Sequence, residues 1–121
     1  MPAFFGVGAP GTVAGASGGK VYAWNTLDAV TPLLVAPANT ARRKITFHNP
    51  GTVDVFVFPQ YVQTTGSDVA NTVTVSVLGG ALRVYANGGQ FEIDGECSGA
   101  WYALAASGSA NPLTVIDTNI S

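Results

Sequence analysis

The stretch at residues 42–58 reads RRKITFHNPGTVDVFVF and decides the class of fold. Its two halves, Arg42–Asn49 and Val53–Phe58, are rich in the β-branched and aromatic residues that suit pleated strands. The Asn-Pro-Gly between them is a turn signal, because Asn and Gly tolerate the backbone geometry of tight turns. Apart from Asp54, the second half is apolar on both faces. This predicts a central strand that is covered on both faces, and another subunit could provide one of these two covering surfaces.

Short runs of the same kind continue on both sides of this stretch, separated by turns rich in Gly, Asn and Ser, and none shows sustained helical spacing. Thr72–Leu78 alternates most cleanly, with Val on one face and Thr or Ser on the other. The pattern predicts an all-β protein, a β-sandwich or jelly roll of about eight short antiparallel strands. The expected strands are Lys20–Trp24, Ala29–Val35, Arg42–Asn49, Val53–Phe58, Thr72–Leu78, Ala81–Ala86, Gln90–Asp94, Ala100–Ala106 and Pro112–Asp117.

The composition indicates an exterior that other polypeptides cover in part. A chain of 121 residues has room for a single domain. Only 10% of its residues are charged and 47% are hydrophobic, whereas about 25% charged residues is usual. Surface that does not face water needs few charges, so we expect an assembly. A Thr- and Ser-rich surface on a secreted protein is the alternative.

Residues 1–19 differ from the rest, because they contain six glycines and no charged side chain. Phe4, Phe5 and Val7 would expose apolar surface in a solvated linker. We therefore expect an extended N-terminal arm whose phenylalanines insert into a neighbouring subunit, followed by a sandwich domain at residues 20–121. A frayed or cleaved terminus is the alternative interpretation of the same residues.

Charge and hydropathy exclude several classes of partner. The net charge is −2, whereas a nucleic-acid-binding protein normally carries a basic excess. No apolar run approaches the roughly 18 residues of a membrane helix. The single cysteine, Cys97, cannot form a disulfide within the chain. We expect no nucleic acid, no membrane and no signal peptide, since no basic residue precedes the apolar start.

One basic cluster, Arg42-Arg43-Lys44, holds three of the five basic residues. It fits a solvated strand edge, where charge prevents unwanted pairing, or a contact with an acidic partner.

The acidic residues Glu92, Asp94 and Glu96 follow at period two, so they share one face if the strand continues through Gly95. A solvent-facing acidic strand is the simplest interpretation, and calcium binding or glycoside hydrolysis are alternatives. A sharper hypothesis pairs this cluster with the arginines of a neighbouring subunit.

Motifs of catalysis are missing from the sequence. His48 is the only histidine and has no partner at metal-ligand spacing, and no G-x-S-x-G turn occurs. We therefore expect no enzyme activity, no cofactor and no metal site. The tyrosines and tryptophans could stack on sugars, but they more often fill a core.

Four segments together resemble small virion proteins of tailed bacteriophages. They are ARRKITFHNPGTVDVFVFP at 41–59, GGAL at 79–82, GGQFEI at 88–93 and GAWYALAASGSANPLTVI at 99–116. The resemblance covers about residues 36–116 and includes no catalytic signature. It implies a capsid decoration or cement protein, or another small head or tail component, present in many symmetric copies.

The resemblance implies a virion protein on the capsid exterior, made in the bacterial host cytoplasm. Its partners would be the major capsid protein and further copies of itself, for example in a trimer. A carbohydrate- or receptor-binding module of a phage tail or fibre is the alternative. The expected interface residues are Phe4, Phe5, Val7, Arg42, Arg43, Arg83, Glu92 and Asp94.

Overall fold

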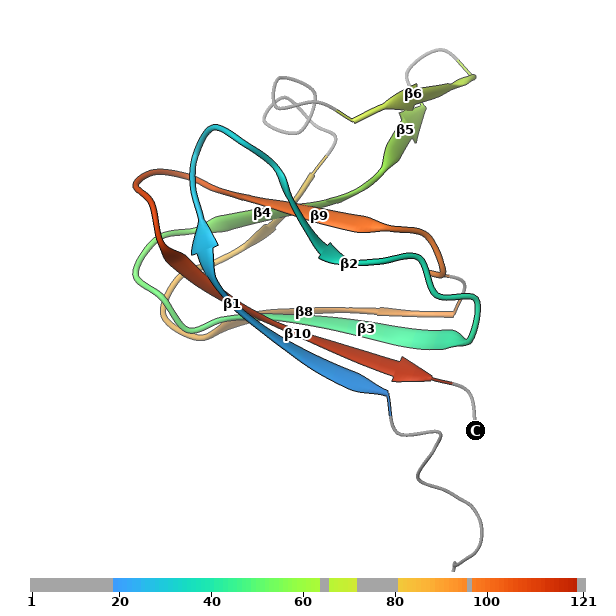
Figure 1. Ribbon diagram of the computed structural model, residues 1–121, viewed down its shortest axis with the longest axis horizontal. Helices are drawn as coiled ribbons and strands as arrows, with labels where there is room; N and C mark the ends of the chain where they lie inside the picture. The colour runs from blue at the N-terminus through green and yellow to red at the C-terminus, as the bar shows by residue number, and fades with distance from the viewer. Residues whose placement is uncertain (1–18, 64–65, 72–80, 96, 120–121) are drawn as a thin grey trace, which may run out of the picture.

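The computed structural model describes residues 19–63, 66–71, 81–95 and 97–119, and these contain strands and turns but no helix. Two four-stranded antiparallel sheets pack face to face (Figure 1). The first sheet has the order β1 (Lys20–Leu27), β10 (Asn111–Asn119), β3 (Arg42–Asn49), β8 (Gly89–Asp94). The second has the order β2 (Leu33–Ala36), β9 (Trp101–Ala105), β4 (Val55–Pro59), β7 (Leu82–Val84). A separate hairpin is formed by β5 (Tyr61–Gln63) and β6 (Asp68–Ala70).

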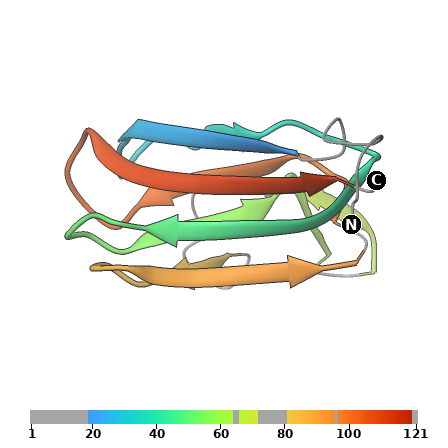
Figure 2. The ribbon, with the colours of Figure 1, turned by 90° about the horizontal axis from the view of Figure 1, so that it is seen from below.

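The strands pair in nested order. β4 pairs with β7, β3 with β8, β2 with β9 and β1 with β10, so the first half of the chain runs antiparallel to the second half. Successive strands from β1 to β4 alternate between the two sheets, and those from β7 to β10 do so again. Figure 2 shows the first sheet from outside, with β1 at one edge and β8 at the other. The β5–β6 hairpin projects from the end where β4 leaves the second sheet (Figure 1).

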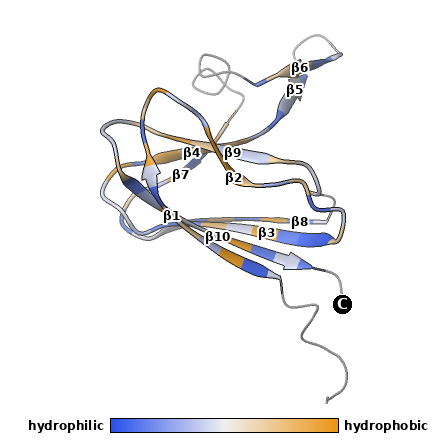
Figure 3. Ribbon diagram, in the orientation of Figure 1, coloured by the Kyte–Doolittle hydropathy of each residue, from blue (hydrophilic) through white to orange (hydrophobic). Residues whose placement is uncertain are grey.

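The core lies between the sheets, and strands such as β10 supply alternate residues to it, as period-two alternation requires. Phe47 and Val115 of the first sheet are fully buried, as are Val55 and Val57 of the second. Phe47 contacts Trp101 across the interior, with ring centroids 5.4 Å apart. Figure 3 shows the apolar β4 in orange and the charged beginning of β3 in blue. The predicted all-β architecture with antiparallel strands is confirmed.

Local patterns predicted most of the described strands correctly. β3 has the expected bounds, and β4 is central, between β9 and β7. The predicted Asn-Gly turn before β8 is confirmed, since Asn87 and Gly88 have φ angles of 64° and 98°. The outer face of β4 is covered in part by residues of this same chain, because Phe58 is buried and its ring stacks on that of Tyr102.

Two predictions about strands need correction. A strand was expected at Ala29–Val35, but β2 begins only at Leu33. The Asp28 carboxylate accepts hydrogen bonds from the backbone N–H groups of Val30 (2.9 Å) and Thr31 (2.8 Å), which hold this segment in a turn. The turn signal at residues 65–68 overlaps the first residue of β6, which pairs with β5 in a hairpin that was not predicted. The expected strand Thr72–Leu78 lies outside the described residues.

Candidate functional site

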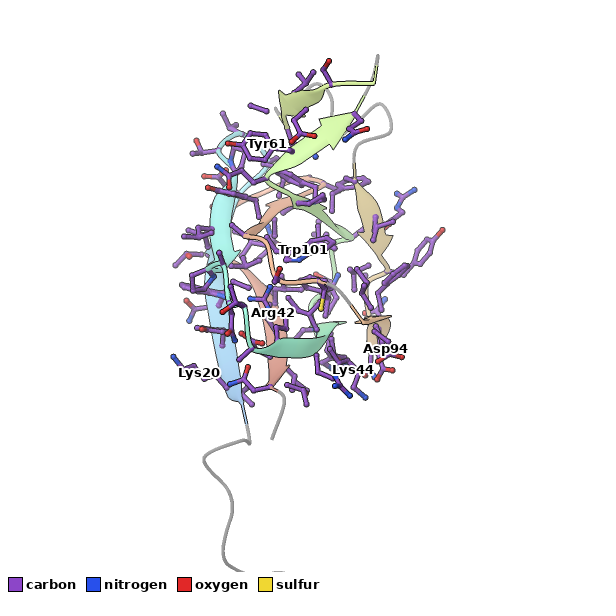
Figure 4. The ribbon with its side chains drawn as sticks, turned by 90° about the vertical axis from the view of Figure 1, so that its right-hand side faces the viewer. Lys20, Arg42, Lys44, Tyr61, Asp94 and Trp101 are labelled. Carbon is purple, nitrogen blue, oxygen red and sulfur yellow. The ribbon has the colours of Figure 1, made fainter. Side chains whose placement is uncertain are left out.

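Arg42, expected at a solvated strand edge or in a contact with an acidic partner, lies inside the domain. Lys44 is paired with Thr118 but Arg42 with Asn119, so β3 carries one extra residue, Arg43, at a β-bulge. The bulge directs Arg42 into the interior, where it is 3% exposed. Figure 4 shows Arg42 within the body of the molecule, whereas Lys44 lies at its lower margin. This corrects the expectation that Arg42 is exposed to an acidic partner.

The Arg42 guanidinium is hydrogen-bonded through all three of its nitrogens. Nε donates to Asp117 Oδ1 (2.9 Å) and Nη2 to Asp117 Oδ2 (3.3 Å). The remaining donors reach three backbone carbonyls, those of Cys97 (2.6 Å), Gly99 (2.8 Å) and Pro37 (2.7 Å). A guanidinium has five N–H groups, so none remains for a ligand. This arrangement joins β3, β10 and two connections, and its role is structural.

Asp117 and Asn39 complete this cluster, and sequence reasoning missed both. Asn39 Nδ2 lies 3.3 Å from Asp117 Oδ2 and donates to Asn119 Oδ1 at 2.7 Å. One signal for Asp117 was present: it continues the inward alternation of Leu113 and Val115 along β10. An acidic residue at an inward position requires a buried partner, because an unpaired charge is costly to bury.

Cys97 and His48 do not form a thiol–imidazole pair. Cys97 belongs to the core cluster, and burial raises the pKa of its thiol, which keeps it protonated. His48 alternates with Phe47 and therefore projects from the opposite, outer face of β3. The histidine therefore does not lie where it could activate the thiol as a nucleophile.

The outer face of the first sheet changes from apolar to acidic between its two edges. One row of neighbours crosses all four strands: Val21 on β1, Ile116 on β10, Thr46 on β3 and Glu92 on β8. Val21 is 66% and Ile116 38% exposed. The next row ends with Asp94, which is opposite Lys44 (Figure 4). Glu92 and Asp94 therefore share the exposed outer face that their spacing predicted.

The predicted acidic cluster is only partly described. β8 ends at Asp94, Gly95 follows with a φ of 84°, and Glu96 lies outside the described residues. Within the described part of the chain, no three His, Cys, Asp or Glu side chains are grouped so that they could hold a metal ion.

Arg83 lies on the outer face of the second sheet and contacts its own chain. Its Nη2 is 2.9 Å from Asp54 Oδ2, and its guanidinium carbon lies 5.5 Å from the Phe56 ring centroid and 5.4 Å from that of Tyr85. The Arg83 side chain is still 49% exposed, so it remains accessible to a partner. The bulged Arg43 is also exposed.

A pocket of about 300 Å³ lies beside the β5–β6 hairpin, on the outer side of the second sheet. The Tyr102 and Phe58 rings stack there with centroids 6.1 Å apart and planes 18° apart. Sequence reasoning missed this pocket because the hairpin that contributes to it was not predicted. The lining residues are Pro32, Phe58, Gln60, Ala70, Asn71 and Tyr102.

The expected arm anchors Phe4, Phe5 and Val7 lie outside the described residues. Among the described residues, no helix is long and apolar enough to cross a membrane. Comparison of the chain with protein-family models, with curated proteins and with solved structures gives no match.

Proposed function

We propose that this chain is a virion structural protein, a capsid decoration or cement protein that binds the assembled head of a tailed bacteriophage. The nested strand order is the observation that carries the proposal. With the β5–β6 hairpin set aside, we interpret the orders β1-β10-β3-β8 and β2-β9-β4-β7 as those of a jelly roll, a long antiparallel ribbon wound into two sheets. Viral capsid domains and lectin domains both use this architecture.

The proposed role is mechanical and non-catalytic. Binding only to the assembled shell stabilises that shell by mass action. Each contact can be weak because many symmetric copies act together. The low charge content and the exposed Val21 and Ile116 support a partly covered exterior. Four exposed charged residues are suited to the rim of a contact with the major capsid protein: Arg43, Glu92 and Asp94 on the first sheet and Arg83 on the second.

The N-terminal arm is the proposed anchor on the shell. Gly19 has a φ of 88°, and a Cβ at this position would overlap the carbonyl oxygen of Asp117. Only glycine fits there, so the backbone at the start of β1 passes close to β10. Phe4 and Phe5 lie fifteen or so residues before this point, a reach of about 50 Å if that segment is extended.

Removal of residues 1–18 is expected to weaken attachment to particles by at least about tenfold, since apolar anchors dominate such contacts. The measurement is the amount of protein bound by purified particles that lack this chain. The variant Phe4→Ala/Phe5→Ala in the full chain should reproduce the loss, and Val7→Ala should have a smaller effect. Undiminished occupancy by the shortened protein would disprove the anchor role.

The number of copies of this chain in each virion tests its location in the shell, since the copy number of a shell protein is proportional to that of the major capsid protein.

The pocket beside the hairpin favours a second candidate, a carbohydrate-binding module of a tail or fibre. Tyr102 offers an aromatic ring and Gln60 an amide, the two kinds of group that recognise a sugar's apolar face and its hydroxyls. If this candidate holds, Tyr102→Ala should weaken glycan binding by about tenfold. Tyr85→Ala is the matched control, because Tyr85 is exposed but does not line the pocket. A wild-type chain that binds nothing on a glycan array would rule this candidate out.

A further inference from the structure

In the part of the chain that the structure describes, the two sheets have four edge strands, and three of them are protected against pairing with another strand. In the second sheet, β2 has four residues and β7 three, which is too short to offer a long template. In the first sheet, β8 has six residues but presents the exposed carboxylates of Glu92 and Asp94. Short edges and charged edges are the usual means by which proteins avoid edge-to-edge association.

The fourth edge strand, β1, lacks this protection. It has eight residues, KVYAWNTL, and its only charged residue, Lys20, is the first. It contains no proline, and its pairing with β10 is regular from Lys20 to Trp24. Within the described residues no strand pairs with its other side, so that side presents free backbone N–H and C=O groups.

An exposed apolar stripe lies along the same edge. Val21 and Ala23 are exposed on the outer face of β1, and Ile116 is the neighbour of Val21 on β10. Toward the interior, Trp24 closes the gap between the sheets by donating from Nε1 to the carbonyl of Val35 at 3.0 Å. The inner side of β1 is therefore linked to the second sheet, and its unpaired edge faces away from the domain.

We propose that two copies of this chain associate by antiparallel pairing of their β1 strands, which joins their first sheets into one continuous sheet. A two-fold axis makes this contact self-complementary, since each copy contributes the same residues. Antiparallel pairing places the two Lys20 ammonium groups at opposite ends of the contact, so like charges do not meet. It also places Val21 and Ala23 of both copies on one face, where they cover each other. This inference concerns the free protein and does not rest on binding to a capsid.

The first test is the mass of the full-length chain in solution, measured by sedimentation velocity over a range of concentrations. We expect a reversible dimer in the wild type. Val21→Lys and Ala23→Lys place like charges on both sides of the contact and should each weaken dimerisation by at least about tenfold. Val30→Lys is the matched control, because Val30 is 74% exposed but lies in the turn after β1. Its dimer should be unchanged.

A second measurement, hydrogen exchange, needs no variant. In the wild type, amides of β1 should exchange more slowly as the concentration rises through the dissociation constant, while amides of β8 should not change. A wild type that remains monomeric, a trimer or an open-ended series of oligomers, a dimer unaffected by Val21→Lys, or protection at β8 would each overturn the proposal. A dimer protected at β1 that fails to bind particles would leave it intact and count against the decoration role alone.

Discussion

Replacement of Arg42 by alanine is expected to lower the free energy of unfolding by about 3–5 kcal/mol, a large part of the stability of a small domain. The substitution leaves the Asp117 carboxylate buried without its cation, and it leaves the carbonyls of Pro37, Cys97 and Gly99 without their donor. Unfolding in urea, followed by tryptophan fluorescence, measures the loss. Arg43→Ala is the matched control, since the neighbouring side chain is exposed, and should change stability by less than about 0.5 kcal/mol.

The double variant Arg42→Met/Asp117→Leu distinguishes the loss of the ion pair itself from the cost of leaving one buried charge unpaired. Removal of both charges avoids an unpaired buried ion, so we expect a smaller loss than the sum of the two single substitutions. If Arg42→Ala were as stable as Arg43→Ala, the buried ion pair would not support the fold.

The second large effect is expected at Phe47, a fully buried residue of β3 whose ring contacts Trp101 on the opposite sheet. Phe47→Ala should cost about 3–5 kcal/mol, because it removes apolar contacts and leaves a cavity where the sheets meet. Phe47→Leu fills more of this space and should cost clearly less. The same urea titration measures both, and Trp101 fluorescence reports on the site itself. Equal stability of the alanine and leucine variants would contradict the assignment of Phe47 to a closely packed core.

Of the candidate surfaces, the sequence predicted the acidic face but neither the β1 edge nor the pocket. Glu92 and Asp94 were placed on one exposed face correctly, because alternation along a strand depends only on neighbours in the sequence. The exposed β1 edge was not recognised, since the position of a strand at the edge of a sheet depends on the strands around it. The pocket was missed for a similar reason: Pro32, Gln60 and Tyr102 belong to segments far apart in the chain.

The inward orientation of Arg42 is the clearest case in which alternation along a single strand gives the wrong prediction. Strict alternation through Ile45 and Phe47 would turn Arg43 inward and Arg42 outward. The bulge opposite Asn119 reverses this, and it brings Arg42 to Asp117, a residue 75 positions away. A bulge depends on how two strands pair, so neither strand's own sequence indicates it.

The amino-acid sequence by itself determined the all-β class, the position of β3 and the turn at Asn87 and Gly88, because period-two alternation and turn geometry are properties of adjacent residues. Only the tertiary structure decided the nested order of the strands, the inward course of Arg42 and the unprotected edge at β1. These depend on contacts between distant segments, whose energies are set by packing and by the burial of charge.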